Sequence, residues 1–496
     1  MRFKNTTYLR LISSTLSNFN RNLETYIFSS YFIIILFSIA IISRLWFFWQ
    51  PPFSGDEAIH MLRAVSISRG VFDLITLNQI DVAFQNIYTP ILQHNHPLLE
   101  YLILIPSVFF EPRELFARLV YVVINLLALT FSYKILKKKF GINASIIFLI
   151  LAGTSIFLIY WSQSAMYISL AFFGGAFTTI SIINFYLRSG KSSLYLLAVS
   201  FAASTLIFQD FIFYIPGIIW LLWDKRRKIK LKYICYALLL SVIIAGVFYL
   251  PYIIYGVLNW PKNMGFNYVI VSKLSSNVNI FRNIEGYWTN FFGAPGIFVT
   301  WPFIILFFRR VLQLGYSKYL LLTLLIYLFV FILRSVTPFL YFVSILGILM
   351  ILSARVLSSI KYRALIVTLI LIINTIPVLL ILKGIHNPFL FTNLARYSQI
   401  KQIGILAKKC VIDENETYVS TADAWQAMYY FGRPSLFEEE RVEVINNFAT
   451  NGNELIKFIH FQRGQISEEV QSKLESSALQ KTYFNDDIVL IYKNCA

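Results

Sequence analysis

The composition of this 496-residue chain excludes an ordinary soluble protein. Hydrophobic residues make up 57% of it and charged residues only 14%, whereas soluble domains carry about 25% charged residues. The composition therefore predicts an integral membrane protein and excludes a disulfide-rich secreted scaffold, a collagen-like fibre and a disordered chain. The net charge of +18 comes from cations between apolar runs, so it indicates an orientation in the membrane and not a nucleic-acid partner.

Charge divides the chain into two regions. Residues 1–382 contain 31 Lys and Arg against 11 Asp and Glu, whereas residues 383–496 contain 12 against 14. The second region has no long apolar run and alternates strand-like with helix-like patterns. We therefore expect a polytopic all-α membrane protein with about 11 to 13 transmembrane helices, followed by a small soluble α/β domain.

The membrane region is expected to begin with a retained anchor helix. A basic, polar cytoplasmic segment at 1–25 precedes the first apolar run, and it is too long a lead for a simple cleaved signal peptide. The transmembrane domain then covers 26–382, with spans predicted to begin near residues 26, 115, 143, 166, 193, 211, 231, 297, 318, 337 and 363.

Basic clusters between the spans predict the orientation. They should face the cytoplasm with the N-terminus, and they comprise Lys134, Lys137–Lys139, Arg188, Lys191, the segment 224–232, Arg309, Arg310, Lys318, Arg355, Lys361 and Arg363. The alternation then places a first loop at 50–114, a second loop at 256–296 and the domain at 383–496 outside. The apolar segment 96–110 contains Pro106 and is short for a span, so we expect it to be interfacial or re-entrant.

Carboxylates of the membrane region concentrate on the predicted outer side. Glu24 and Asp224 fall on the cytoplasmic side, and the others lie at or near the outer face: Asp56, Glu57, Asp73, Asp81, Glu100, Glu111, Glu114, Asp210 and Glu285. Carboxylates near a membrane are costly and usually mark function, although an exposed loop carries them at little cost. The polar chemistry is therefore expected at the outer face.

Asp56 and Glu57 stand out because they follow the first span directly. Two prolines and a glycine in PPFSGDEAIHML end that helix, and a short helical pattern resumes at the two acids. Acidic residues at a helix start are also ordinary capping groups. From these residues alone, a capping role and a functional role both stay open.

Several motifs resemble the GT-C glycosyltransferases. GDEA at 55–58, His96–Pro97 before an apolar segment, and Glu114 with Arg118 in an ExxxR spacing are similar to that family's first external loop. Further matches are KKKFG at 137–141, YWSQSAMY at 160–167, Arg334 with Pro338 and Tyr341 at a late span, and YYFGRPSLF at 429–437. The chain looks most similar to the dolichyl-phosphate-mannose protein mannosyltransferases and the lipid A aminoarabinose transferases.

The chain also departs from the family pattern. Ser164 and Met166 stand where the family often has Glu and Arg. Phe208, Gln209 and Asp210 replace a frequent TKY or TRY, which removes a cation and adds a carboxylate. Substrate and lipid contacts at these points are therefore not transferable from the family.

The resemblance implies transfer of a sugar, with inversion, from a dolichyl or undecaprenyl phosphate to an extracytoplasmic hydroxyl of a protein, glycan or lipid acceptor. Asp56 matches the family's general base, and Glu57 is the second acid of that motif. Arg118 and Arg334 are candidates for stabilising the leaving phosphate, although both also suit a place at lipid headgroups. Glu114, His96 and Tyr167 are further substrate-binding candidates.

A metal site and a second function class stay open. Glu57, His94 and His96 could bind a divalent ion, but an HxH spacing without a third ligand at a fixed offset is more typical of solvated histidines. The alternative function is a multi-span transporter or flippase of a lipid-linked sugar, although interrupted helices and repeated halves are not evident.

The C-terminal region has its own predicted elements. They are a helix at 396–410, a strand at 416–422, a helix at 424–430, a helix at 467–477 and a final hairpin that ends with IVLIYKN. Cys410 and Cys495 both fall in this external domain, which makes a disulfide between them an option.

Overall fold

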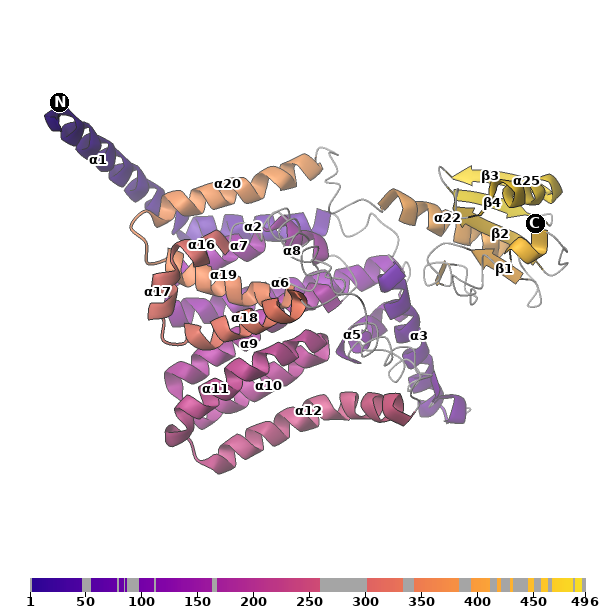
Figure 1. Ribbon diagram of the computed structural model, residues 1–496, viewed down its shortest axis with the longest axis horizontal. Helices are drawn as coiled ribbons and strands as arrows, with labels where there is room; N and C mark the ends of the chain where they lie inside the picture. Colours follow the sequence, from indigo (N-terminus) through magenta and orange to yellow (C-terminus); the bar gives the residue numbers. More distant parts are fainter. Residues whose placement is uncertain are drawn as a thin grey trace. The chain divides into compact units, whose positions relative to one another are not determined.

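The computed structural model describes the chain in segments, and these are residues 2–46, 55–77, 80–83, 85–86, 98–110, 113–162, 167–258, 301–332, 343–382, 394–410, 417–420, 429–430, 445–449, 456–462, 466–484 and 487–492. The chain forms two compact units. One combines Met1–Phe48 with Ser66–Leu390, and the other combines Trp49–Val65 with Phe391–Ala496. The first is a helical bundle, and the second contains a small sheet (Figure 1).

The described elements before residue 383 are all helical. They are α1 (Arg2–Ile27), α2 (Ser30–Trp46), α3 (Gly55–Ile75), α5 (Leu98–Val108), α6 (Arg113–Phe140), α7 (Ile142–Gly153), α8 (Ile156–Trp161), α9 (Tyr167–Arg188), α10 (Lys191–Ile207), η1 (Gln209–Tyr214), α11 (Ile215–Lys225), η2 (Arg226–Lys228), α12 (Leu231–Leu258), α16 (Trp301–Leu306), α17 (Phe308–Gln313), α18 (Ser317–Ile332), α19 (Val343–Leu357) and α20 (Arg363–Leu382).

Two helices in the described part of the chain are long and apolar enough to cross a membrane, namely Arg113–Phe140 and Leu170–Arg188. The pair α1 and α2, bent by 67° at its break, forms a third candidate. Shorter apolar helices make up much of the remaining bundle. The predicted all-α body is therefore confirmed, whereas the number of spans stays a prediction.

Three segments differ in detail from the apolar pattern. The N-terminal segment forms a 26-residue helix. The span predicted from residue 143 ends after 12 residues, and α8 follows after a short break. The described part of the span predicted from residue 297 consists of two six-residue helices, α16 and α17.

Helix α5 agrees with the interfacial or re-entrant interpretation of segment 96–110. It has 11 residues with Pro106 inside it, so at about 1.5 Å per residue it is much shorter than the roughly 30 Å of a bilayer core.

Helices α9 and α19 pack backbone against backbone at the centre of the bundle. A Cβ atom at Gly175 would collide with the carbonyl oxygen of Ser344, and a Cβ at Gly347 would collide with the backbone nitrogen of Ala176. Every residue of α19 except Arg355 is buried. Figure 1 shows α9, α10 and α12 side by side, and the contacts between these helices agree. Small residues at such crossings allow the close approach that membrane helices use for association.

The second unit contains a four-stranded sheet with strand order β1-β2-β4-β3. Its elements are α22 (Leu394–Cys410), β1 (Thr417–Ser420), β2 (Ile456–Gln462), α25 (Glu468–Ser477), β3 (Gln480–Phe484) and β4 (Asp487–Ile491). Strands β1 and β2 are parallel, and the other pairs are antiparallel. The predicted first helix, first strand, late helix and final hairpin are confirmed, while most of the helix predicted at 424–430 lies outside the described residues.

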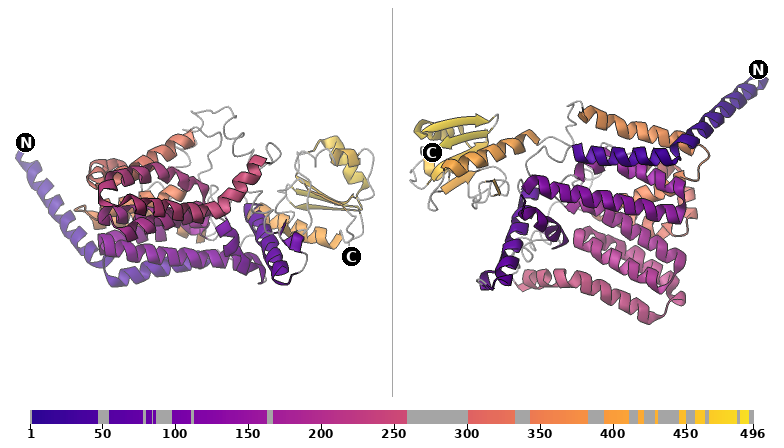
Figure 2. Two further views of the ribbon diagram at one scale, coloured as in Figure 1. Left: turned by 90° about the horizontal axis from the view of Figure 1, so that it is seen from below. Right: turned by 180° about the vertical axis from the view of Figure 1, so that it is seen from behind.

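The sheet is covered by a helix on each face (Figure 2). Ile403 and Ala407 of α22 pack against Phe458, and Leu474 of α25 packs in the cluster that contains Ile459. Cys410, at the end of α22, is disulfide-bonded, whereas Cys235 in α12 is free. The remaining cysteine, Cys495, lies outside the described residues.

The glycine crossing predicts a stability effect. Gly347→Ala should lower the free energy of unfolding by about 1–3 kcal/mol, because the added methyl group must displace backbone atoms. The matched change Gly246→Ala in α12 would meet only a Val242 methyl carbon at 3.7 Å, so it should leave stability unchanged or slightly higher. Thermal unfolding in detergent measures both, and equal midpoints for the two variants would contradict the close packing.

The disulfide predicts that Cys410→Ser destabilises the C-terminal domain of the full chain by about 2–5 kcal/mol. Cys235→Ser removes a cysteine that is free in the bundle and should leave the domain unaffected. Limited proteolysis of the full-length protein with and without reductant provides the readout. A domain that resists protease equally in both variants would show that the bond contributes nothing.

Candidate functional site

Four Asp, Glu, Lys or Arg side chains are buried in the part of the chain that the structure describes: Arg44, Glu57, Arg118 and Asp210. Burying a charge is expensive unless other groups compensate it. Each of the four lies at or near a helix end that the sequence predicts to face outward. Buried charge in the described residues is thus confined to the predicted outer side, where the candidate transfer site was placed.

Asp56 and Glu57 lie in the first turn of α3. Glu57 is only 4% exposed and His60, three residues further on, is 1% exposed. Residues spaced by three on a helix lie on one face, so Glu57 and His60 are two buried polar residues on the same face of α3. The helix that the sequence predicted to resume at these acids is confirmed, whereas the side chain of Asp56 lies outside the described atoms.

Helix α6 presents a buried polar face that begins near its N-terminal end, which the sequence predicts to face outward. Glu114 lies in the first turn and is half-buried, while Arg118, Tyr121 and Asn125 are buried. Asn125 Nδ2 donates a hydrogen bond to the backbone oxygen of Tyr121 at 2.9 Å. Arg118 is only 4% exposed, so its guanidinium faces the protein interior, which argues against a role limited to reaching lipid headgroups.

The other predicted site residues fall largely outside the description. Tyr167 begins α9, with its side chain outside the described atoms, and His94, His96 and Arg334 lie outside the described residues. No group of three His, Cys, Asp or Glu side chains suited to a metal occurs in the described segments. Because Glu57 is the one predicted ligand among them, the metal site stays a prediction.

Arg44 ties the end of α2 to the break between α7 and α8. Its guanidinium donates to the backbone oxygens of Gly153 at 2.9 Å and Ala152 at 3.1 Å, and also to Ala40 in its own helix at 3.2 Å. Gly153 and Ala152 are the last residues of α7, whose final carbonyls have no partner within the helix. A buried cation there also interacts favourably with the partial negative charge of the C-terminal end of α7.

A second side chain, from α20, reaches the same break. Asn374 Nδ2 donates to Thr154 Oγ1 at 3.2 Å, and Thr154 Oγ1 donates to the backbone oxygen of Ile150 at 2.6 Å. Non-helical backbone at membrane depth is tolerated where protein groups satisfy it. Arg44 and Asn374 therefore stabilise the interruption, and Arg44 fixes the end of α2 just before the loop that the sequence predicts to be external.

Asp210 belongs to a buried polar network that joins η1, α18 and α19. Tyr327 Oη donates to Asp210 Oδ2 at 3.4 Å, and Ser344 Oγ donates to Tyr327 Oη at 3.0 Å. Tyr214 Oη donates to the backbone oxygen of Ser344 at 3.0 Å. All four residues are buried. The carboxylate by which this chain departs from the family pattern is thus held by groups from two later helices.

Sequence reasoning missed Arg44, His60, Tyr327 and Ser344 as members of polar sites. Arg44 carried a usable signal, because a cation at the end of an apolar run must be satisfied in lipid. Tyr327 and Ser344 carried none, since their role depends on their distance from Asp210 in space.

The Arg44 contacts predict that Arg44→Met destabilises the bundle by about 1–3 kcal/mol, because the side chain no longer satisfies the last carbonyls of α7. Arg21→Met provides the control, since Arg21 lies on the exposed surface of α1. Thermal unfolding in detergent compares the two. An Arg44→Met protein that melts with the Arg21→Met control would mean that the α7 end needs no cation.

No protein-family model matches this sequence, and no curated protein matches it. Solved structures do match. ArnT from Cupriavidus metallidurans bound to undecaprenyl phosphate has a TM-score of 0.61 at 12% identity, over 94% of this chain and 98% of ArnT. Its apo state has a TM-score of 0.57 at 12% identity, over 93% of this chain and 98% of ArnT.

A second protein shares the likeness. The Archaeoglobus fulgidus oligosaccharyltransferase in complex with Zn and sulfate has a TM-score of 0.50 at 12% identity, over 86% of this chain and 67% of its own. At such identities the likeness shows the fold alone, so this chain shares the fold of ArnT over most of its length.

Proposed function

We propose that this protein is a membrane glycosyltransferase that moves a sugar from a polyprenyl phosphate to an acceptor hydroxyl on the extracytoplasmic side. The observation that carries the proposal is the match of 94% of the chain to nearly the whole of ArnT. Because fold alone does not fix function, the first-loop motif and the buried charges at the same predicted end provide independent support.

Asp56 is the proposed general base. The acceptor oxygen attacks the anomeric carbon while the bond from that carbon to the lipid phosphate breaks, which inverts the configuration. The acceptor's proton passes to the Asp56 carboxylate, and the polyprenyl phosphate leaves with the bonding electrons. A carboxylate suits this step because it accepts a proton only as the hydroxyl becomes acidic during attack.

Negative charge that develops on the leaving phosphate requires a cation. Arg118 suits this role because its guanidinium is shielded from solvent, where a charge–charge interaction is stronger than in water. Arg334 is the second proposed phosphate contact from the sequence resemblance. Glu114, one turn before Arg118 in α6, and His96 and Tyr167 complete the proposed substrate contacts.

Glu57 is proposed to act beside Asp56. Its position in the first turn of α3 and its burial allow it to hold a donor or acceptor group in place without competition from water. A divalent ion bound by Glu57, His94 and His96 would supply further positive charge for the phosphate. The passage of the acceptor's proton to the Asp56 carboxylate is proposed without a role for such an ion.

The decisive experiment compares native protein with Asp56→Asn in membranes supplied with a panel of labelled polyprenyl-phosphate sugars and total cell-envelope acceptors. Transfer should fall by about 10²–10⁴-fold in the variant, the range expected for a lost general base. Asp81→Asn is the matched control because Asp81 is an exposed carboxylate of the same predicted loop, and it should retain native transfer.

The outcomes separate the function classes. Transfer that is lost with Asp56→Asn and retained with Asp81→Asn supports the transferase and identifies its donor. Equal transfer by both variants would remove Asp56 as the base. Absence of transfer with every donor, combined with movement of the lipid-linked sugar between leaflets of vesicles, would favour the transporter or flippase.

A further inference from the structure

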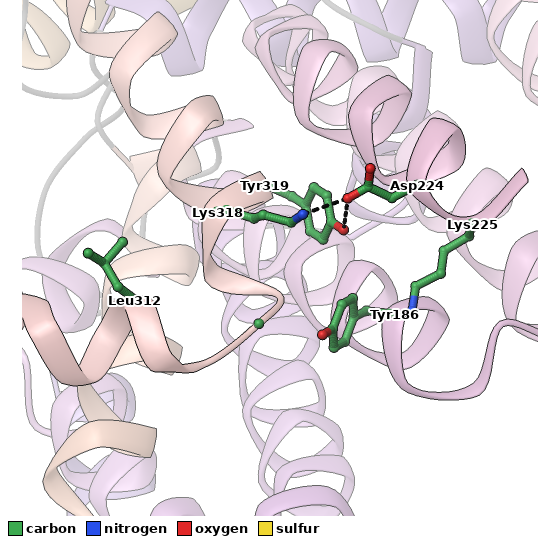
Figure 3. Close-up of a pocket in the computed structure, with 7 residues that line it drawn as sticks. Tyr186, Asp224, Lys225, Leu312, Lys318 and Tyr319 are labelled. Atoms are coloured by element: carbon green, nitrogen blue, oxygen red, sulfur yellow. Dashed lines mark hydrogen bonds and ion pairs between the residues drawn. The ribbon is translucent and has the colours of Figure 1, made fainter.

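A cavity of about 450 Å³ lies in the bundle at the end that carries the basic clusters, termed here the basic end. It lies between the end of α9, the end of α11 and the turn that joins α17 to α18, and it is lined by Tyr186, Asp224, Lys225, Leu312, Gly315, Lys318 and Tyr319 (Figure 3). The cavity and Asp210 are at opposite ends of the η1–α11 segment. The proposed transfer reaction therefore leaves it without a role.

The negative charge of the carboxylate in this pocket is already balanced by a lysine. Lys318 Nζ lies 2.6 Å from Asp224 Oδ2, and Tyr319 Oη donates to the same oxygen at 2.7 Å. Both side chains point at the carboxylate in Figure 3. These two hydrogen bonds lower the pKa of Asp224, which follows the apolar part of α11. Asp224 thus forms an ion pair with Lys318. The residues that line the pocket include no other carboxylate that could pair with Lys225.

Lys225 is the cation that this arrangement leaves over. Its Nζ lies 4.1 Å from the centre of the Tyr186 ring, and it has no ion-pair partner within the described segments. Partial burial lowers its pKa and the positive charges of Lys228 and Lys318 lower it further, while the nearby Asp224 carboxylate offsets only part of this lowering. An anion placed in the pocket would relieve this repulsion.

The wall of the pocket formed by Tyr186 is closely packed. A Cβ at Gly315 would collide with the hydroxyl of Tyr186, so the turn can lie beneath the phenol only because residue 315 has no side chain. The Tyr186 ring also packs against the rings of Tyr316 and Tyr319, each with its centroid 6.0 Å away. Lys225 therefore extends along an aromatic wall whose position is fixed by three neighbours.

Side chains around the opening are typical of a membrane surface. Trp220 and Trp223 are 39% and 64% exposed, and the guanidinium of Arg226 lies 4.1 Å from the Trp223 ring. Exposed tryptophan beside cations is usual at the level of lipid headgroups. Leu312 of the pocket lining and Phe308, about one turn earlier in α17, are both exposed, and they offer an apolar surface for an acyl or prenyl chain.

Charge balance supports an external anion. The two acids predicted on this side of the chain, Glu24 and Asp224, are both paired, Glu24 with Arg363 at 3.1 Å and Asp224 with Lys318. We propose that the pocket binds the phosphate of an anionic membrane lipid, with Lys225 as its principal contact. Basic pockets between helices at a membrane surface recognise such headgroups, and the cavity is large enough for one.

The test measures lipid binding by purified full-length protein in phosphatidylcholine nanodiscs doped with phosphatidylglycerol, with undecaprenyl phosphate, or with neither. Native mass spectrometry counts retained lipid, and thermal unfolding reports stabilisation by the bound lipid. Phosphatidylglycerol or undecaprenyl phosphate should raise the unfolding midpoint above that in phosphatidylcholine alone. The lipid that does so identifies the source of the phosphate.

Lys225→Gln should weaken binding of that lipid by about ten-fold or more, the loss expected for one charged hydrogen bond. Lys230→Gln is the matched control, since it removes the same charge from an exposed site in the same segment. Both variants should melt like the native protein in phosphatidylcholine alone.

Three results would overturn the proposal. Equal loss of binding in both variants would indicate diffuse attraction to an anionic surface. An unfolding midpoint that is the same with either anionic lipid as in phosphatidylcholine alone would exclude selection of an anionic headgroup. If inorganic phosphate displaced the bound lipid at concentrations as low as those at which the lipid itself binds, the result would indicate a soluble ligand. None of these results depends on whether the protein transfers sugar.

Discussion

The bundle depends on the close approach of α9 and α19 at Gly175 and Gly347. Lipid gives apolar helices no hydrophobic reason to associate, so close packing and hydrogen bonds must hold them together. With no Cβ at either glycine, the two backbones touch, and α19 is buried along nearly its whole length. The first turn of α19 then supplies the Ser344 hydroxyl to Tyr327 and the Ser344 carbonyl to Tyr214. The position of α19 therefore also sets the surroundings of Asp210.

Charged side chains are buried at one end of the bundle and exposed to solvent at the other. At the predicted outer end Arg44, Arg118 and Asp210 are buried, which is costly unless other groups compensate the charge. At the basic end, charges are accessible: Lys318 keeps 44% of its side chain exposed while it pairs with Asp224. The first arrangement fits the proposed transfer reaction, and the second fits the proposed binding of an anionic headgroup.

Much of the helical framework could be predicted from the sequence. Helices begin at Arg113, Lys191 and Arg363, close to the starts predicted near residues 115, 193 and 363, because a long apolar run bounded by cations favours a helix. The break after α7 could not be predicted, because its carbonyls are satisfied by Arg44, more than 100 residues earlier, and its threonine by Asn374, more than 200 residues later. A pattern of apolar residues does not contain such partners.

The same distinction applies to the candidate site. The first-loop acids, Glu114 and Arg118 are candidates because neighbouring residues form a recognisable motif, and Asp210 was noticed because it adds a carboxylate where the sequence departs from a TKY or TRY pattern. The compensating groups are a property of the fold: Tyr327 is 117 residues from Asp210, and Lys318 is 94 residues from Asp224. A charged residue in a membrane sequence thus reveals that a partner is needed. Only the packing of the helices determines which partner it is, and whether the pair is sealed inside the protein or left open to a ligand.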